Sequence, residues 1–358
     1  MPSPDRGSST RRFPTAEVEV SVALATYEGA RWLRTLLDSI AAQEHLPDEL
    51  VVQDDRSSDG TVEGVRRFAA DAPFEVHLEV NDVRLGSTAN FAAALERCRG
   101  RFVALADQDD VWYPAKLRRL VHELRQDPTV TMVFSDADLI GEDGRRLNRR
   151  LWETRLVGRT LRRRAVVPEE LFARRALTTG CTMAVRRRAI AAALPFPDEL
   201  ADEAAPMRHD RWLSLVSAAV GTVRALPEPL LGFRVHPSQE TGVLLGRDLT
   251  RALGRVGAGV VSGQQEGAAI AGHLARASQL EIAAARVQGL GDFEEAATLR
   301  RIAAHHRLRA ARGDGLKDRL REVAEGVRTG GYDRDLFGAG AAVADVVRAV
   351  RTAAAGRA

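Results

Sequence analysis

The densest group of chemically competent side chains follows the apolar stretch Phe102–Ala106. Three carboxylates, Asp107, Asp109 and Asp110, come within the next four positions. Carboxylates this close repel one another, so we expect a cation to compensate them. Oxygen ligands suit Mg²⁺ or Mn²⁺, and Mg²⁺ is often held by one or two carboxylates together with substrate phosphates. The alternative is a solvated acidic turn in which Asp110 or a neighbour caps the next helix.

Further carboxylates stand at the ends of other expected elements. Asp54 and Asp55 follow the short run Leu50–Gln53, and a capped turn is the alternative role for this pair. Asp210 opens an apolar segment that we expect to be helical, where an N-cap is the alternative role. A carboxylate at such a helix start can also face a crevice and take a proton from a substrate hydroxyl.

Apolar periodicity predicts alternating strands and helices over the first part of the chain. The expected strands are 18–25, 50–53, 74–80 and 101–106, and the expected helices are 30–43, 61–70, 91–98 and 115–125. This alternation predicts an α/β fold with a mainly parallel central sheet flanked by helices. Because the carboxyl ends of parallel strands share one edge, the two groups of aspartates that follow strands are expected to converge on one crevice.

The rest of the chain divides by composition. We expect a strand over 131–140, a hairpin turn at 141–144, a strand near 183–185 and extended segments at 223–225 and 227–233. The arginine-rich segment 145–177 gives no clear pattern. The predicted organisation is a disordered lead-in over 1–16, a catalytic domain over 17–245 and a helical C-terminal region over 246–358.

Composition narrows the class of protein. The 358 residues carry a net charge of only +3, but arginines crowd 145–188. Such local basicity suits phosphates, anionic lipid head groups or nucleic acid, or is a solvated surface. Two cysteines exclude a disulfide framework. The basic N-terminus lacks the apolar segment of a signal peptide, and no uncharged apolar run reaches the ~20 residues that span a bilayer. We expect a cytoplasmic protein, at most peripheral on the inner face of the plasma membrane.

Four motifs, in this order, resemble family 2 glycosyltransferases of the GT-A fold over about residues 18–240. They are Val20–Tyr27, Asp54–Thr61, Asp107–Trp112 and His209–Trp212. The form Asp-Gln-Asp-Asp-Val-Trp, with Thr179–Met183 downstream, is similar to the rhamnosyltransferase-like branch. The resemblance implies a nucleotide-sugar donor and Mn²⁺ or Mg²⁺ as cofactor, which would stabilise the diphosphate leaving group.

Carried over onto this sequence, the resemblance makes Asp109 the first metal ligand. Asp107 would contact the donor's sugar or ribose, or reach the metal through water, and Asp110 would be mainly structural. His236 follows an aromatic-Arg pair, as in related enzymes, and would complete the metal shell through neutral imidazole. A structural histidine is the alternative.

The resemblance also implies a donor side. Asp55 would contact the nucleotide base, with Tyr27 stacking or packing beside it. The residues placed on this side are Ala25, Tyr27, Asp54, Asp55, Arg84, Asp107 and Gln108. Arg84 would contact phosphate or be an exposed arginine. The family often has Asn after the Tyr, and Glu28 replaces it here.

Asp210 is the expected general base. It would take the proton of the acceptor hydroxyl while the sugar–phosphate bond breaks, and a single in-line displacement inverts the anomeric centre. The residues expected on the acceptor side are Thr179, Gly180, Cys181 and Trp212. The Cys181 side chain is expected to be packed rather than reactive, and Trp212 is expected to be a core residue, with stacking on sugar as its alternative.

The leading hypothesis is a metal-dependent, inverting hexosyltransferase of cell wall polysaccharide biosynthesis. It would use dTDP-rhamnose by preference, and its acceptor would be a cell-surface glycan or lipid-linked saccharide. The alternatives are a UDP-sugar donor or a non-catalytic nucleotide- or glycan-binding module. Nucleic-acid binding through 145–188 has no aromatic platform to support it. The C-terminal helices are expected to cap the catalytic domain, with peripheral membrane contact, a partner or a homodimer as alternatives.

Overall fold

The computed structural model describes residues 18–154, 165–166, 178–201, 207–239, 263–310, 321 and 323–325. The lead-in predicted for 1–16, most of the segment 155–177 and the domain boundary expected near 245 lie outside these ranges.

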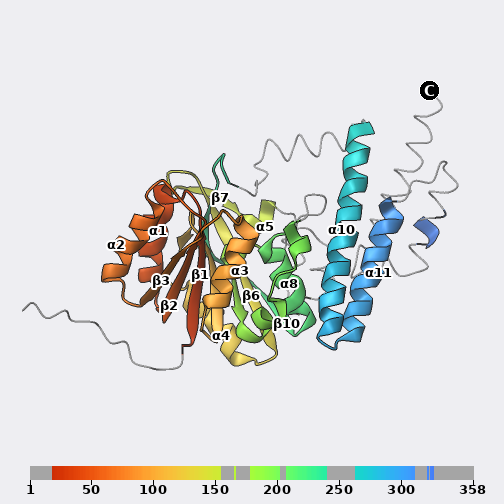
Figure 1. The fold of residues 1–358 in the computed structure, drawn as a ribbon, viewed down its shortest axis with the longest axis horizontal. Helices are drawn as coiled ribbons and strands as arrows, with labels where there is room; N and C mark the ends of the chain where they lie inside the picture. Colours follow the sequence, from red (N-terminus) through yellow and green to blue (C-terminus); the bar gives the residue numbers. More distant parts are fainter. Residues whose placement is uncertain are drawn as a thin grey trace, which may run out of the picture.

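The first part of the chain alternates strands and helices, as the sequence predicts (Figure 1). The order is β1 (Val20–Thr26), α1 (Ala30–Ala41), β2 (Glu49–Asp54), α2 (Thr61–Asp71), β3 (Glu75–Val80), α3 (Ser87–Arg97) and β4 (Phe102–Asp107). The strands pair in parallel in the order β3-β2-β1-β4. Right-handed crossovers then put α1 and α2 on one face and α3 on the other. The direction in which successive strands are added reverses between β1 and β4. Their carboxyl ends therefore form a switch point, where open α/β sheets bind ligands.

The second part of the chain extends this sheet. It comprises β5 (Val111–Trp112), α4 (Lys116–Gln126), β6 (Val130–Ile140), β7 (Arg146–Arg150), α5 (Leu151–Thr154), β8 (Ala165–Val166), η1 (Gly180–Thr182), β9 (Met183–Arg186), α7 (Arg187–Ala193), η2 (Asp198–Ala201), α8 (His209–Ala219) and β10 (Thr222–Arg234). Beyond β4 the sheet continues as β9-β6-β10-β5. The mainly parallel α/β fold is therefore confirmed, with β9 antiparallel to both of its neighbours.

Two local predictions differ from the structure. The extended segments expected over 223–233 form one strand, β10, whose register with β6 shifts three times. Helix α3 begins at Ser87 rather than at Phe91, because Gly86 turns the chain with a φ of 82° and its carbonyl accepts the N–H of Asn90. The Asn90 side chain is buried and donates to the carbonyl of Gln53, so a polar stretch that looks like a loop is the first turn of a helix.

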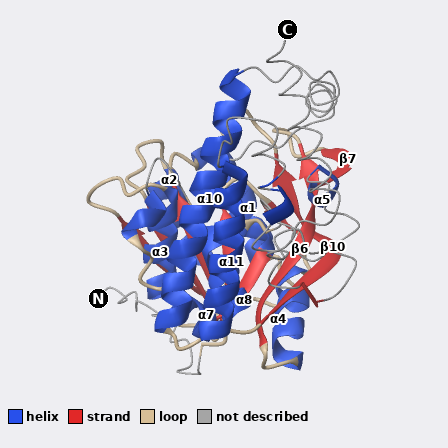
Figure 2. Cartoon of the chain, turned by 90° about the vertical axis from the view of Figure 1, so that its right-hand side faces the viewer, coloured by secondary structure: helices blue, strands red, loops and turns tan. Residues whose placement is uncertain are grey.

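The C-terminal region contributes two described helices, α10 (Gly263–Gly289) and α11 (Phe293–Ala310). They lie side by side beyond α8, at the end of the molecule away from α2 (Figure 1), and stand in front of the sheet when this end faces the viewer (Figure 2). Leu280, Ala284 and Val287 of α10 are fully buried and continue the main core. None of the described helices combines the length and the apolarity that a bilayer crossing requires. The burial of the α10 side chains in the main core supports the interpretation of the two helices as a cap on the sheet domain.

Arg286 of α10 fastens the helix pair to the sheet domain. Its guanidinium donates to the carbonyls of Leu194 at 3.0 Å and Pro195 at 2.6 Å, just after α7. It also lies 5.7 Å from the ring centre of Trp212 in α8. One side chain thereby joins α10 to the ends of two elements of the sheet domain.

We expect Arg286→Ala to lower the free energy of unfolding by about 1–3 kcal/mol, because the charge-assisted hydrogen bonds to the carbonyls of Leu194 and Pro195 are lost. Urea unfolding followed by circular dichroism measures this. Arg307→Ala is the matched control, since Arg307 is half-exposed and pairs with Glu281 inside the helix pair. Its expected effect is below about 1 kcal/mol. Equal losses in the two variants would contradict the anchoring role of Arg286.

Candidate active site

The end of β4 lies beside the end of β1 and carries the acidic motif. Asp107 is the last residue of β4 and pairs in register with Ala25 of β1. Asp109 follows in the turn, and its Oδ2 lies 2.7 Å from Nε2 of His236, just beyond β10. The structure thus joins two predicted metal ligands that stand 127 positions apart in the sequence.

His236 is held in place by its surroundings. Its Nδ1 lies 2.9 Å from the hydroxyl of Ser238, and its ring packs on Trp32 with a centroid distance of 4.3 Å. The Arg234 guanidinium lies 5.7 Å from the same Trp32 ring and donates to the main-chain oxygen of Asp109 at 2.7 Å. Contacts of this kind orient a ligating imidazole before any metal arrives.

Asp210 belongs to the same cluster. Burial, together with the neighbouring carboxylates of Asp109 and Asp210, raises the pKa of Asp107 to about 7. Asp210 lies in the first turn of α8, whose N-cap is Arg208, so Asp210 is not the N-cap. Its Oδ1 accepts the main-chain N–H of the next residue, Arg211. The carboxylates at the end of β4 and at the start of α8 therefore face one crevice.

Asp110 and Lys116 form a buried layer beneath this crevice. Asp110 is 1% exposed, its Oδ1 accepts the N–H of Arg234, and burial raises its pKa. Helix α4 has Ala115 at its N-cap and no side-chain cap, so the idea that Asp110 caps the helix is wrong. Lys116 is fully buried, and its Nζ donates to the main-chain oxygen of Cys181 at 2.6 Å. Burial lowers the pKa of Lys116 to about 7.

The donor-side residues after β1 are clamped by Gln108. Its Oε1 accepts the N–H of Tyr27 at 2.9 Å, and its Nε2 donates to the Tyr27 carbonyl at 2.8 Å. A Cβ on Gly29 would lie 2.2 Å from Oε1 of Gln108, which explains the glycine. The Arg84 guanidinium lies 4.0 Å from the centre of the Tyr27 ring, which remains 37% exposed. Tyr27, Arg84 and Gln108 are thus brought together at the switch point.

The carboxylates of Asp54 and Asp55 accept hydrogen bonds from the protein itself. The Asp54 oxygens accept the hydroxyls of Thr26 and Ser57 and the N–H of Ser57, all at 2.7 Å. The Asp55 oxygens accept the N–H groups of residues 85–86 at 2.6 and 2.8 Å. Asp54 is fully buried, so its predicted contact with the donor is wrong, and the capped-turn alternative describes it. Asp55 holds the loop that carries Arg84, and a direct bond to a base would compete with these contacts.

Glu28 takes over a structural task at its position. Its φ is 48°, in the left-handed region that suits the Asn usual in the family. Its Oε1 accepts the N–H of Ser58 at 2.9 Å, and its own N–H donates to the Ser57 hydroxyl. The carboxylate therefore ties the loop after β1 to the loop after β2.

The acceptor-side turn packs directly against the start of α8. A Cβ on Gly180 would lie 2.7 Å from Nε2 of His209 and 3.7 Å from Cβ of Asp210, so only glycine fits there. Thr179 is buried, and its Oγ1 finds no hydrogen-bond partner in the described part of the chain. The structure therefore brings Gly180, one of the four predicted acceptor residues, close to the expected base, and Thr179 precedes it in the chain.

The other two predicted acceptor residues are core residues. Cys181 is fully buried, and burial raises the pKa of its thiol well above the ordinary value. Trp212 is fully buried as well, and its indole N–H donates to the carbonyl of Ala193 at 3.0 Å. The expectation that these two side chains pack in the core is confirmed, so their placement on the acceptor side does not extend to a side-chain contact with the acceptor.

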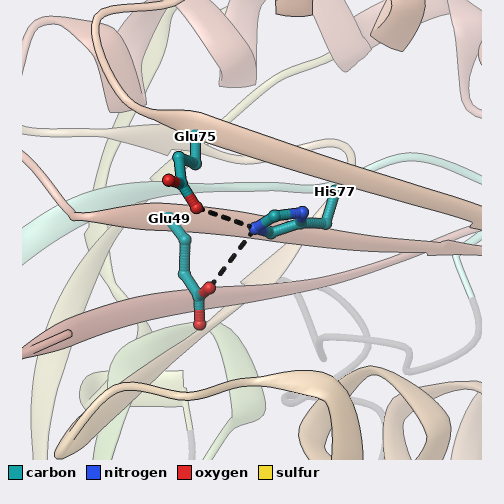
Figure 3. A group of neighbouring side chains, drawn as sticks. All are labelled: Glu49, Glu75 and His77. Carbon is teal, nitrogen blue, oxygen red and sulfur yellow. Dashed lines mark hydrogen bonds and ion pairs between the residues drawn. The ribbon is translucent and has the colours of Figure 1, made fainter. Parts of the chain in front are cut away.

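An acidic group at the opposite edge of the sheet has a different role. Glu49 and Glu75 begin β2 and β3, and His77 lies between them at 3.5 and 3.2 Å (Figure 3). Arg99 Nη2 lies 2.7 Å from Glu49 and 2.6 Å from Glu75, so an internal cation already compensates the carboxylates. We assign this group to ion pairing rather than to metal binding.

The carboxylate crevice suits a hard cation. Ligand atoms of Asp107, Asp110 and Cys181 lie within 4.8 Å of one another, but the thiol and Asp110 are buried in protein contacts. Asp109 Oδ2 and His236 Nε2 lie 2.7 Å from each other, and their side chains are 20% and 6% exposed. With Asp107, whose carboxylate interacts with that of Asp109, these side chains offer mainly oxygen donors, which Mg²⁺ and Mn²⁺ prefer.

The sequence analysis assigned no functional role to three residues near the crevice. Lys116 stands on the buried stripe of α4, where Leu120 and Leu124 follow at helical spacing, and a lysine in that register is a usable signal. Trp32 reads as one more apolar residue of α1. Arg234 reads only as part of an aromatic-Arg pair. Their partners come from distant segments, which the sequence alone does not reveal.

Comparisons with known proteins agree with this arrangement. Residues 21–192 match the model of the family described as Glycosyl transferase family 2. The chain is 29% identical to the protein Rv1520 of Mycobacterium tuberculosis over 219 residues, 61% of this chain and 59% of that protein. It is 33% identical over 130 residues to the succinoglycan biosynthesis protein ExoO of Rhizobium meliloti, 36% of each chain. The chain thus spans about three fifths of the first curated relatives it matches.

The fold has a relative among solved structures. The S. aureus protein TarS, solved in complex with UDP-GlcNAc, superposes with a TM-score of 0.55 and 15% sequence identity. The superposition covers 94% of this chain and 90% of TarS. At this identity the likeness concerns the fold alone, which is that of GT-A enzymes.

The raised pKa of Asp107 predicts a pH dependence of stability. Between pH 4 and about 7 the folded chain keeps a proton that the unfolded chain releases, so the Asp107 contribution to stability falls as the pH rises through this window. Asp107→Asn should therefore raise the free energy of unfolding at pH 8 by about 1–3 kcal/mol and have a much smaller effect at pH 5.

Urea unfolding in metal-free buffer at both pH values measures the difference. Asp71→Asn, at an exposed position at the end of α2, serves as the control and should change nothing at either pH. A gain from Asp107→Asn that is the same at pH 5 and pH 8 would show that the carboxylate is not strained by its neighbours.

Proposed function

We propose, from the match of residues 21–192 to the model of glycosyltransferase family 2, that the chain is a metal-dependent, inverting glycosyltransferase acting on a nucleotide-sugar. The observation that carries the proposal is the convergence of Asp107, Asp109 and Asp210 at the switch point, with His236 bonded to Asp109. A non-catalytic binding module would have no use for three carboxylates held so close together.

Asp109 and His236, with Asp107 beside them, would hold the divalent cation. Bound there, Mn²⁺ or Mg²⁺ supplies a positive charge that stabilises the departing diphosphate. The residues fit this task, because a cation would relieve the repulsion that raises the pKa of Asp107. His236 offers Nε2 to the crevice while Ser238 lies at its other ring nitrogen.

Asp210 would act as the general base on the acceptor side. It takes the proton of the acceptor hydroxyl as the hydroxyl oxygen bonds to the anomeric carbon and the bond from that carbon to the diphosphate oxygen breaks. Attack from the face opposite the leaving group inverts the anomeric centre. Gly180, in the turn where the acceptor would lie, is near the start of α8, since a Cβ at this position would lie 3.7 Å from Cβ of Asp210.

On the donor side, the exposed face of Tyr27 is the natural platform for the nucleotide base. Arg84 covers that ring and carries the positive charge nearest to it, so it is placed to contact the diphosphate once the base displaces it. The Asp55 carboxylate then contributes indirectly: it accepts the N–H groups of residues 85–86 and so holds the loop that carries Arg84.

The donor sugar is a narrower question. The form of the acidic motif favours dTDP-rhamnose, whereas the solved structure of TarS contains UDP-GlcNAc. Both are therefore candidates, with UDP-sugars tested first. ExoO is a succinoglycan biosynthesis protein, and we accordingly propose a cell-surface glycan or lipid-linked saccharide as acceptor.

The metal site is tested with Asp109→Asn. We expect the full-length chain to be stabilised by at least one nucleotide-sugar in a panel of UDP-, dTDP- and GDP-sugars, and more strongly with Mn²⁺, because a ligand that binds only the folded state raises its apparent stability. Asp109→Asn should lose the Mn²⁺-dependent part of the thermal shift, while Asp71→Asn keeps it. No shift from any donor with the unmodified chain would contradict the proposed function.

The base is tested with Asp210→Asn. This variant should keep the donor-dependent thermal shift and lose sugar transfer by roughly 10²–10⁴-fold, the usual contribution of a general base. Transfer is measured as release of nucleoside diphosphate in the presence of acceptor. Ser217→Ala, two turns along α8 and away from the crevice, provides a control on the helix itself. Transfer retained by Asp210→Asn would remove Asp210 as base.

A further inference from the structure

We propose that Lys116 is a positioning residue that sets both the charge of the carboxylate crevice and the place of the acceptor-side turn. The inference rests on the proposed function, because it concerns the same crevice, but neither the family resemblance nor the comparisons assign Lys116 a role.

The geometry of Lys116 is unusual for a lysine. It is the first residue of α4 and is fully buried. Its Nζ lies 3.3 Å from the centre of the Trp112 ring and donates to the carbonyl of Cys181 at 2.6 Å. Burying an ammonium is costly unless charges and acceptors surround it, so the position has a specific use.

The charges that surround Lys116 are those of the crevice floor. Asp110 and Asp107 are the carboxylates that act on the Lys116 ammonium, and both belong to the acidic motif. On the other side of Asp110 the main-chain N–H of Arg234 donates to its carboxylate. Lys116 therefore interacts electrostatically with two carboxylates of the acidic motif.

Lys116 also connects two motifs that lie far apart in the sequence. Through the Cys181 carbonyl, Lys116 holds η1 in place. The first residue of η1, Gly180, lies near His209 and Asp210. The chain of contacts runs from the acidic motif through Lys116 to the expected base. Removing the side chain would release the turn as well as the positive charge.

These two roles predict effects of opposite sign. At pH 6, below its pKa of about 7, Lys116 carries its proton. A crevice without this ammonium is more negative, so Lys116→Met should bind Mn²⁺ more tightly at that pH, on the order of tenfold. The released turn should lower kcat for transfer on the order of tenfold or more without raising the KM for the donor. A lysine that served only stability would weaken Mn²⁺ binding and activity together.

Lys116→Gln separates the two roles, because the amide can still donate to the Cys181 carbonyl but carries no charge. We expect tighter Mn²⁺ binding, as in Lys116→Met, with a smaller loss of kcat. Arg118→Met is the matched control, since it removes an exposed positive charge from the same helix that pairs with Glu44. It should leave both Mn²⁺ binding and kcat close to those of the unmodified chain.

The experiment measures Mn²⁺ binding to the full-length chain by isothermal titration calorimetry, transfer kinetics, and urea unfolding as a check on folding. Mn²⁺ affinity that is unchanged or lower in both Lys116 variants would overturn the inference, as would failure of both variants to fold. If the unmodified chain binds no Mn²⁺, the proposed metal-dependent function fails instead, which is a distinguishable result.

Discussion

The crowding of like charges at the end of β4 is the constraint on which the site depends. The carboxylates that meet there, here called the carboxylate cluster, are Asp107, Asp109, Asp110 and Asp210. Three contacts compensate part of this charge: Lys116 acts on Asp107 and Asp110, the main-chain N–H of Arg234 donates to Asp110, and His236 lies at Asp109. Because a buried carboxylate is costly without such partners, these contacts help to hold β4, α4 and the end of β10 relative to one another. A divalent cation would relieve the repulsion that remains between the carboxylates.

Around the cluster, the protein uses polar side chains to shape its own loops. Gln108 clamps the loop after β1, Asp54 caps the turn after β2, and Asp55 gathers the loop before α3. Each satisfies main-chain N–H groups at a strand end, where regular pairing stops. The donor side is thereby formed in advance, so a ligand would meet fixed loops, and little ordering would be lost on binding.

The sequence predicted the sheet well because its signals are local. Apolar runs that end in Asp54 and Asp107 are buried central strands, and parallel pairing brings their ends to one edge. The pairing of Asp109 with His236 followed only from the resemblance, since nothing local joins residues on different strands. Trp212 and Cys181 were placed on the acceptor side by motif position alone, which does not reveal which way a side chain faces. Lys116 was missed because its partners, Trp112 and the Cys181 carbonyl, meet only in the folded chain.

The two expected sides of the crevice are held by different elements of the structure. The donor side is held by loops fastened to parallel strands. The acceptor side depends on α8, whose Trp212 is enclosed by the carbonyl of Ala193 and by Arg286 from α10. The position of Asp210 is therefore linked to the C-terminal helices through packing on α8. Variation in that region could change acceptor geometry without touching the metal site, which would let donor binding and acceptor choice diverge independently within one fold.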